Sequence, residues 1–427
     1  MIKKISLSLS MLIISVLVFA QDDIKVMQYN LLNYGNITSY CTTTNNNMAD
    51  KEQYLRTIID YVQPDIFCVN EIANISYVHQ RLLDSALNFN SVKQYQKSGY
   101  VNTNGSDLVN MLYYNTAKFV YVSAESVQNH VRDIVLYRLY YNSPNLAQTQ
   151  DTAWVNFIVG HLKAGSSTSD KASRATMTAD AMSYLVQHNY DGNNLFMGDF
   201  NIRKSSEQSY ENLLNYSNST FRFYDPINRS GTWNNSSSFA DIHTQSTHSS
   251  SGCAASGGMD DRFDFILISD NIKNNSAHVS YKPGSYFALG NDGNHFNQSI
   301  NSGTNNSAPA NIIDALYNLS DHLPVIMELH FDSQVSSLVE NTDSKLILNY
   351  QNPIDDILEI NIESEGTEYL TFELWSLNGQ KLLQRELDNQ SNINLSIPIS
   401  NLASGMYIIK INNKEGQNLY ASKIIKR

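Results

Sequence analysis

The feature that most constrains the fold is a change in hydrophobic pattern near residue 332. Before it, strand-like apolar runs such as residues 24–29 alternate with helix-length segments such as residues 50–62, whose apolar residues recur at helical spacing. After residue 345 only short alternating strands remain, separated by turn signals such as Asn352-Pro353. The first pattern predicts a layered α/β domain with helix-covered sheets, and the second predicts a small all-β sandwich.

The N-terminal part contains further predicted elements. Strand-like runs lie at residues 65–69, 111–114, 134–140, 155–160, 195–197, 263–268 and 325–329. A second helix is predicted at residues 170–188, with Ser169 or Asp170 as its N-cap. Residues 215–260 and 282–320 are rich in Asn, Ser and Gly, and we expect them to be long loops that border a site.

Residues 1–20 have the features of a secretory signal peptide. Lys3 and Lys4 precede an apolar run at residues 5–19 that is too short to span a bilayer, and Ala20 supplies a small residue at the break. The alternative is a membrane anchor, and no later segment is apolar enough to span a membrane. We expect three further parts: a main domain at residues 23–332, a linker at residues 333–344 and a β-domain at residues 345–427.

The chain is acidic, with a formal net charge of −12 and a pI of about 5.2. Such a protein does not hold a polyanion through its overall field, so any phosphate contacts have to be local. This argues against a passive nucleic-acid-binding module. It argues less against an enzyme that meets phosphate through a bound cation, because the cation inverts the local potential.

The chain has three cysteines. Cys68 lies in an apolar strand-like run and is predicted to be a buried thiol. Cys41 and Cys253 lie in polar segments and could pair in an oxidising compartment, although their spacing leaves both states open.

Polar residues lie at the ends of the predicted apolar strands in five short segments, and Asp264 is a sixth polar position of this kind. The segments are Gln28-Tyr29-Asn30, Asn70-Glu71, Gly160-His161-Leu162, Gly198-Asp199-Phe200-Asn201 and Ser320-Asp321-His322. Sheets of α/β proteins carry their active sites at strand ends. Each segment alone has a structural alternative, because an acid after a strand often caps a helix and a single histidine often packs in the core. Their joint presence favours a catalytic site.

Three of these residues suit the hydrolysis of a phosphodiester, which needs a cation and a poised water. Glu71 and Asp321 are oxygen ligands for a hard cation such as Mg²⁺, with Mn²⁺ or Ca²⁺ as alternatives. Asp199 could orient or deprotonate the attacking water.

The other residues suit charge stabilisation and proton transfer. Asn30 and Asn201 are neutral amides that can donate to phosphoryl oxygens. His161 and His322 can act as acid or base near neutral pH. Asp264 could hold one of the two imidazoles in a single tautomer.

In these segments and their order, residues 23–332 resemble the DNase I-like endonuclease/exonuclease/phosphatase superfamily. Gly198-Asp199-Phe200-Asn201 is the most recognisable motif, and Ser320-Asp321-His322-Leu323-Pro324 closes the set. The resemblance implies an α/β fold, a four-layer sandwich of two mixed β-sheets flanked by helices. It also implies one or two Mg²⁺-class ions and in-line attack of water on phosphorus.

The resemblance assigns roles around the metal and the nucleophile. Glu71 would bind the metal, with Asn30 and Asp321 close to it. Asp199 would position or activate the nucleophile, and Asn201 would support the transition state.

It also assigns roles beside the phosphate. His322 would form a dyad with Asp264, and His161 would act toward the leaving group. Arg132 resembles a phosphate-contacting arginine of the family, with a plain surface residue as the alternative. Some relatives have an acid that partners the first histidine, and the nearest candidate here, Asp107, is out of register.

Residues 343–427 resemble the type A sorting domain of the type IX secretion system. The resemblance rests on Asn352-Pro353, on Leu374-Trp375-Ser376-Leu377-Asn378-Gly379, on residues 401–410 and on the ending at residues 423–427. It implies the type IX machinery as a partner and export through the periplasm to the cell surface or medium. The domain has no clustered acids, His or Cys, so we expect no chemistry there, and a sugar- or protein-binding sandwich is the alternative.

Three functions follow from these patterns. An extracellular nuclease hydrolysing DNA or RNA is favoured, with nucleic acid as substrate and a monomeric enzyme. A phospholipid or sphingomyelin phosphodiesterase, or a phosphomonoesterase, would use the same chemistry, because a fold does not choose among them. A non-catalytic surface binding protein is disfavoured, because a polar residue is present at every position of the predicted site.

Lys163, Arg174 and Arg262 are candidates for local positive charge at the site.

Overall fold

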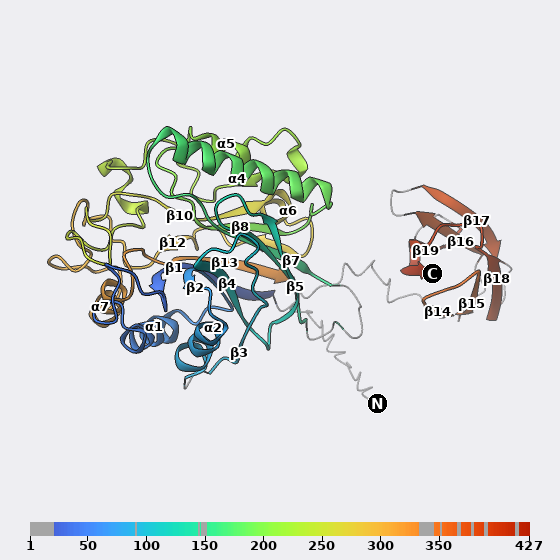
Figure 1. The fold of residues 1–427 in the computed structure, drawn as a ribbon. Helices are drawn as coiled ribbons and strands as arrows, with labels where there is room; N and C mark the ends of the chain where they lie inside the picture. The colour runs from blue at the N-terminus through green and yellow to red at the C-terminus, as the bar shows by residue number, and fades with distance from the viewer. Residues whose placement is uncertain are drawn as a thin grey trace, which may run out of the picture. The chain divides into compact units, whose positions relative to one another are not determined.

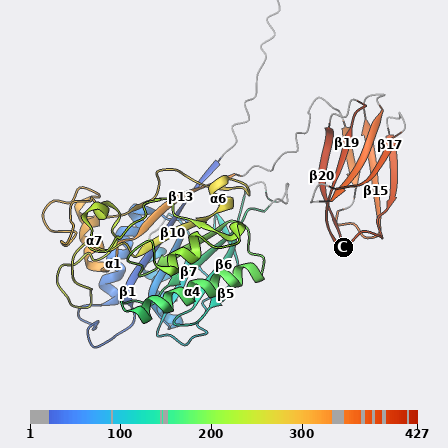
Figure 2. The same cartoon turned by 90° about the horizontal axis from the view of Figure 1, so that it is seen from above.

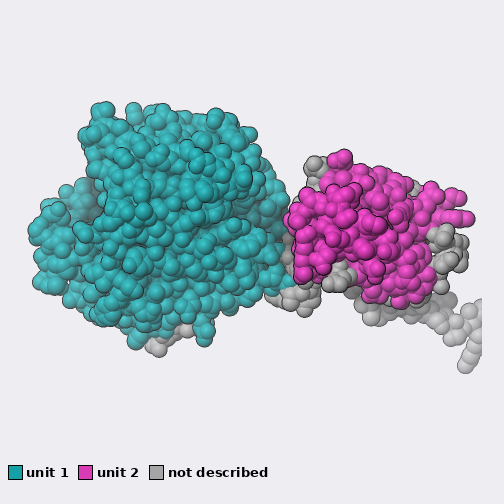
Figure 3. Space-filling view, turned by 45° about the vertical axis from the view of Figure 1, so that its right-hand side comes forward, with its two compact units in different colours: residues 1–333 teal, residues 334–427 magenta. Residues whose placement is uncertain are grey.

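The computed structural model describes residues 21–89, 92–143, 146, 152–332, 346–350, 352–364, 369–376, 380–387, 392–414 and 418–427. The chain divides into two compact units, Met1–Ser333 and Gln334–Arg427 (Figure 3). The expected signal peptide and the expected linker at residues 333–344 lie outside the described residues. Within the described part, no helix has the length and apolar character needed to cross a membrane.

The first unit contains two mixed β-sheets (Figures 1 and 2). The seven-stranded sheet has the order β11-β13-β1-β2-β4-β3, with β12 paired to β13. Its strands are β1 (Gln21–Tyr34), β2 (Ile66–Ala73), β3 (Tyr95–Lys97), β4 (Leu108–Asn115), β11 (Val279–Tyr281), β12 (Phe287–Ala288) and β13 (Val325–Asp332). Only β1 and β2 run parallel in this sheet.

The six-stranded sheet has the order β5-β6-β7-β8-β10-β9. Its strands are β5 (Phe119–Gln128), β6 (Ile134–Tyr141), β7 (Trp154–His161), β8 (Asn194–Asp199), β9 (Phe223–Tyr224) and β10 (Asp264–Ser269). Here β7 and β8 are the parallel pair. Each sheet therefore has one parallel pair, and these two pairs carry most of the candidate site.

Helices cover the outer face of each sheet (Figure 1). On the seven-stranded sheet these are α1 (Met48–Val62), α2 (Ser76–Leu82), which continues into a π-helix at Leu83–Leu87, and α7 (Ala310–Leu319). On the six-stranded sheet they are α4 (Thr168–Gln187) and α5 (Gln208–Leu214). The short helix α6 (Asp270–Asn274) joins β10 to β11, and 3-10 turns lie at Ser219–Phe221 and Ser237–Ile242.

Apolar side chains form three layers in this unit. One layer lies between α1, α2, α7 and the seven-stranded sheet, one lies between the two sheets, and one lies beneath α4 and α5. Burial of this apolar surface is the main force that holds such layers together. The predicted four-layer sandwich of two mixed sheets flanked by helices is confirmed.

Two local predictions are wrong. The N-cap of α4 is Ser167, not Ser169 or Asp170, because the Ser167 side chain accepts from the Asp170 N–H and Asp170 bonds back in a capping box. Residues 282–320 are not one long loop, since β12 and α7 lie within them. In α7, Ile312, Leu316 and Leu319 recur at helical spacing and bury one face of the helix.

The second unit is a β-sandwich of two antiparallel sheets, as predicted. Apolar side chains of both sheets share one core. The strands are β14 (Leu346–Tyr350), β15 (Ile357–Ser364) and β18 (Asn392–Pro398) in one sheet, and β16 (Leu370–Ser376), β17 (Lys381–Leu387), β19 (Gly405–Asn412) and β20 (Asn418–Lys426) in the other.

The parallel strands β7 and β8 approach closely at a pair of glycines. Gly160 and Gly198 lie opposite each other, and a Cβ added to Gly198 would lie 1.8 Å from the Gly160 carbonyl oxygen. Gly198 also has a φ of 140°, which side chains rarely adopt. A glycine is therefore required one residue before Asp199.

We expect Gly198→Ala to lower the free energy of unfolding by about 3 kcal/mol, through backbone strain and overpacking together. Chemical denaturation of the full chain measures this. Gly192→Ala is the matched control, because a Cβ there meets nothing within 4 Å and its φ is not positive. Equal stabilities of the two variants would contradict this account of the strand contact.

Candidate active site

The predicted polar residues meet at one edge of the two sheets. Asn30 lies in β1 and Glu71 in β2, which are parallel neighbours. The remaining positions come from the six-stranded sheet and the start of β13. They are His161 at the end of β7, Asp199 at the end of β8, Asp264 at the start of β10, and Asp321 and His322 just before β13. The fold thus brings together all of them from distant parts of the chain.

Glu71, His161 and Asp199 form a group that can hold a metal ion. Their ligand atoms all lie within 4.8 Å of one another. His161 Nε2 lies 3.4 Å from Asp199 Oδ2 and 3.8 Å from Glu71 Oε1. The amide of Asn30 donates to both carboxylates, at 3.0 Å to Glu71 Oε1 and 3.1 Å to Asp199 Oδ2. Two carboxylates and one imidazole that converge in this way fit a divalent cation.

His322 and Asp264 form a buried dyad. His322 Nδ1 lies 2.8 Å from Asp264 Oδ2, and its Nε2 lies 3.7 Å from Asp199 Oδ2. Burial alone would lower the pKa of His322, but the carboxylates of Asp264, Asp199 and Asp321 raise it well above its usual range. The bond to Asp264 leaves Nε2 facing the other site residues.

Burial also shifts the pKa values of Asp199 and His161. Burial raises the pKa of Asp199 to about 7; the His322 imidazole opposes this, and Asp264 and Glu71 add to it. Burial lowers the pKa of His161 well below its usual range, with Arg132 and His322 adding to the effect. His161 Nδ1 is buried with no hydrogen-bond partner, in keeping with the poor register of Asp107.

Asp321 is held beside this group by residues 215–260, the segment that the sequence predicted as a long loop bordering a site. Asp321 Oδ2 accepts from the Ala255 N–H at 2.9 Å and from the Gln245 amide at 3.3 Å. The same Gln245 amide lies 2.8 Å from His322 Nε2. Asp321 Oδ1 is buried without a partner, so one carboxylate oxygen remains available for a ligand. Gln245 lies in a polar stretch without periodicity, and no sequence signal pointed to it.

Asn201 and Arg132 lie at the margin of the centre. Asn201 has a φ of 53°, and its N–H donates to Asp199 Oδ1 at 3.1 Å. Its amide donates to the Leu162 carbonyl at 3.4 Å. Arg132 is half-buried and donates to the same carbonyl at 3.3 Å, so its guanidinium lies beside the strand end that carries His161.

Lys51 is a second residue that the sequence analysis missed. It lies on α1 with 3% of its surface exposed, and its ammonium donates to the carbonyls of Leu31 at 2.8 Å and Leu32 at 2.6 Å. Leu32 and Asn33 are both left-handed, with φ of 47° and 51°. The N–H of Asn33 donates to Glu71 Oε2 at 3.0 Å. Lys51 therefore supports the strained turn that orients Glu71.

The three candidate cations of the site are already paired. Lys163 lies 2.9 Å from Asp170, Arg174 is buried against Glu207 at 2.6 Å, and Arg262 is buried against Asp225 at 2.7 Å. The expectation that they supply free positive charge to a substrate is therefore not supported. A buried, hydrogen-bonded ion pair of this kind is a structural feature.

The C-terminal unit has a match among known families. Residues 349–427 match the family model described as "Secretion system C-terminal sorting domain". This unit is a sorting domain of the type IX secretion system, and it directs the protein to the cell surface or the extracellular space. The predicted localisation is confirmed. No curated protein matches the chain.

Solved structures similar to the chain include members of the endonuclease/exonuclease/phosphatase family. A family protein from Bacteroides thetaiotaomicron shares 15% identity with a TM-score of 0.46, covering 74% of this chain and 97% of its own. One from Bacteroides vulgatus shares 14% with a TM-score of 0.45, covering 73% and 99%. TDP2 from D. rerio, complexed with single-strand DNA product, shares 12% with a TM-score of 0.43, covering 72% and 98%.

We expect Lys51→Met to change how stability depends on pH. Burial lowers the pKa of Lys51 from 10.5 to about 7, so the unfolded chain binds the extra proton between these values. Below pH 7, burial of the Lys51 ammonium lowers the free energy of unfolding by its full amount. This loss becomes smaller as the pH rises above 7. The wild type should therefore gain up to about 4 kcal/mol of unfolding free energy over Lys51→Met between pH 7 and pH 10.

Urea denaturation in EDTA across this pH range measures the difference. Lys25→Met is the matched control, since the half-buried Lys25 ammonium also donates to a backbone carbonyl, that of Val62 at 2.8 Å. A difference between the wild type and Lys51→Met that stays constant from pH 7 to pH 10 would show that the pKa of Lys51 is not lowered in the folded chain.

Proposed function

We propose that the protein is a secreted, metal-dependent phosphodiesterase, and that its substrate is nucleic acid outside the cell. The observation that carries this is the convergence of a metal-capable group, Glu71 with His161 and Asp199, on the His322–Asp264 dyad at one sheet edge. A cation site, a carboxylate within reach of a water and a cationic imidazole are the parts that phosphodiester hydrolysis requires. The sorting domain supports action outside the cell.

We infer that Glu71 binds the metal, with Asn30 and Asp321 close to it. Glu71 is fixed by the Asn33 N–H, and Asn30 bridges Glu71 to Asp199, so both are oriented before a ligand arrives. The unpartnered Oδ1 of Asp321 supports its assignment. A bound Mg²⁺, or Mn²⁺ or Ca²⁺ in its place, would neutralise phosphate charge and acidify a water.

The other residues would orient the reactants and move protons. Asp199 accepts a proton from the attacking water, and Asn201 donates to a phosphoryl oxygen. His322 is held by Asp264 at Nδ1 and is cationic because its pKa is raised, so its Nε2 N–H can donate toward the charge that develops on phosphorus. His161 acts on the leaving-group side, where its buried Nε2 lies near Asp199.

The assignment of Arg132 is a proposal of the same kind. Its guanidinium lies beside the end of β7 and contacts the carbonyls of His161 and Leu162. From there it can contact a phosphate oxygen next to the dyad without leaving the half-buried position.

A monomer is sufficient for this chemistry, because every residue named comes from one chain.

A second substrate class is favoured by one observation. Lys163, Arg174 and Arg262 are all occupied by carboxylates, so the site has little free positive charge to follow a polyanion. A phospholipid, sphingomyelin or a phosphomonoester needs only the local phosphate contacts. The same catalytic residues would serve these substrates.

The test is hydrolysis of plasmid DNA, RNA, sphingomyelin and a phosphomonoester by the purified chain, with Mg²⁺ and with EDTA. We expect cleavage of nucleic acid that EDTA abolishes. Glu71→Ala and His322→Ala should lower the rate about 10²–10⁴-fold, because each removes a group that acts on the reacting phosphate.

His330→Ala is the matched control for the histidine change. His330 lies near the far end of β13 and pairs with Asp23, so its loss should leave the rate unchanged. EDTA-sensitive turnover of only the lipid or the monoester would move the protein to the second substrate class. Full activity of Glu71→Ala or His322→Ala would refute the catalytic assignment.

A further inference from the structure

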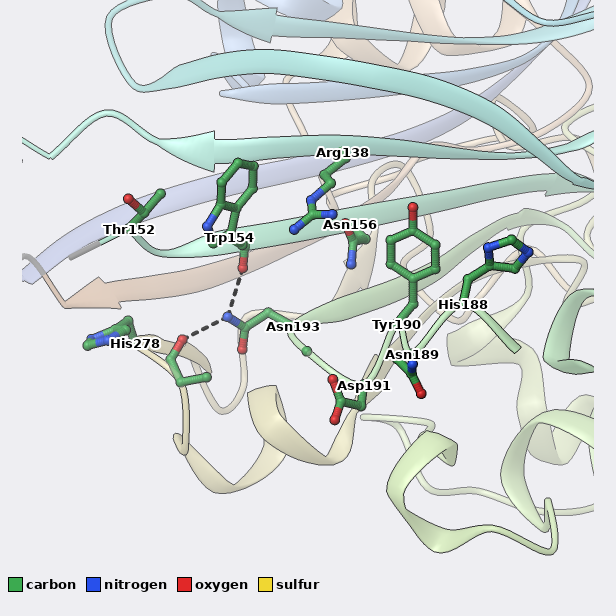
Figure 4. A pocket seen from close by; sticks show the side chains of 12 residues that line it. Arg138, Thr152, Trp154, Asn156, His188, Asn189, Tyr190, Asp191, Asn193 and His278 are labelled. Carbon is green, nitrogen blue, oxygen red and sulfur yellow. Dashed lines mark hydrogen bonds between the residues drawn. The ribbon is translucent and has the colours of Figure 1, made fainter. Parts of the chain in front are cut away.

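A second pocket lies at the end of the six-stranded sheet away from the candidate active site. It has a volume of about 320 Å³ and is lined by residues of β6, β7 and the connection from α4 to β8 (Figure 4). Trp154 is the first residue of β7 and His161 is its last. At about 3.3 Å per residue, the pocket lies roughly 20 Å from the catalytic centre. It is therefore not part of that site.

One wall of this pocket is an aromatic and cationic stack. The Arg138 guanidinium lies 4.4 Å from the centre of the Trp154 ring and 5.9 Å from that of Tyr190. Tyr190 is fixed in turn, because its hydroxyl donates to Glu125. Trp154 keeps 38% of its surface exposed, which is unusual for so large an apolar side chain on a strand. A rigid, partly exposed aromatic wall is a common element of small-ligand sites.

Two buried asparagines line the pocket beside this wall. Asn156 and Asn193 are 6% and 4% exposed. Their amide nitrogens are engaged, with Asn194 Oδ1 for Asn156 and with the carbonyls of Trp154 and Ala277 for Asn193. These hydrogen bonds fix this part of the pocket before a ligand arrives.

The charges of the pocket point to a neutral ligand. Arg138 supplies positive charge, and the exposed carboxylate of Asp191 lies on the opposite side (Figure 4). A phosphate or carboxylate would meet Arg138 favourably and Asp191 unfavourably. A sugar hydroxyl both donates and accepts, so sugar hydroxyls can bond to the Asp191 carboxylate and to the Arg138 guanidinium together. The C–H face of a sugar ring also suits the Trp154 wall.

We propose that this pocket binds a sugar residue of a glycan. The proposal does not depend on the phosphodiesterase assignment, because it shares no residue with the catalytic centre. A protein that the sorting domain delivers outside the cell meets glycans on cell surfaces and in the surrounding matrix. A sugar subsite would hold the enzyme near such material while the other sheet edge performs hydrolysis.

The test uses the purified full chain and saturation-transfer difference NMR. The probes are glucose, galactose, mannose, fucose and N-acetylglucosamine, each offered singly at 20 mM, with adenosine and cytidine as a separate arm. We expect at least one sugar to show saturation transfer, and its affinity by titration to fall at least 10-fold in Trp154→Ala. Asp191→Asn should weaken binding as well, and this exposed position avoids the risk that a strand substitution prevents folding.

Two controls locate the binding. Glu71→Ala should leave sugar affinity unchanged, and Tyr77→Ala removes another exposed aromatic residue, 65% exposed, from a different part of the unit. Trp154→Ala should keep the wild-type hydrolytic rate. The proposal is overturned if no sugar of the panel binds, if only the nucleosides bind, if Asp191→Asn and Trp154→Ala bind like the wild type, or if Glu71→Ala abolishes binding.

Discussion

The side chain of Asn70 joins the two sheets at the edge where the candidate site forms, and the rest of the site depends on this joint. Its oxygen accepts from Gln28 of the same sheet at 2.6 Å and from the Asp199 N–H of the other sheet at 2.9 Å. Its amide donates to Asn110 at 2.6 Å and to the Gly160 carbonyl at 3.3 Å. Asn70 is fully buried, so leaving one of these bonds unmade would cost about 1–3 kcal/mol, and the bonds therefore fix one relative position of the sheets. Glu71, the next residue in the chain, is set against Asp199 by the same contacts.

With the sheets fixed in this position, the site has to accommodate the mutual repulsion of its carboxylates. Four carboxylates lie in the centre and are brought out of water by the fold: Glu71, Asp199, Asp264 and Asp321. Two cationic groups offset their repulsion from opposite sides. His322 lies among three of the acids, and Lys51 approaches from α1, where both Asp321 and Glu71 favour its charge. The unpaired oxygens of Asp264 and Asp321 show that this compensation is incomplete, which is the condition under which a cation binds tightly.

Much of this arrangement could be predicted because its signals are local. The site residues follow apolar runs, and parallel neighbours bring such ends to one edge of a sheet, so the strand ends of Asn30 and Glu71, and those of His161 and Asp199, could be expected side by side. Lys51 was missed although a signal was present: it lies on the stripe of Leu55, Ile58 and Val62 that α1 buries. A lysine in an apolar stripe indicates a buried partner, here the carbonyls of a left-handed turn.

A loop bordering the site was predicted at residues 215–260, but its conformation could not be predicted, since it depends on contacts between distant segments. Gln245 has no periodic neighbours, and its contact with His322 exists only because residues 245–261 fold back on the start of β13. The pairing of Lys163, Arg174 and Arg262 is of the same kind, because each partner lies on another element or turn. Sequence identified these cations but not the acids that neutralise them.

The disulfide links the site to the compartment in which it works. Cys41 and Cys253 are joined across 212 residues, which ties the segment after β1 to the loop that donates the Ala255 N–H to Asp321. Such bonds persist only in oxidising surroundings, and closing so long a loop removes much freedom from the unfolded chain. The sorting domain directs the chain to the cell surface or the extracellular space, where such a bond is stable. The loop at Asp321 is therefore closed covalently where the protein acts, which constrains one of its four central carboxylates.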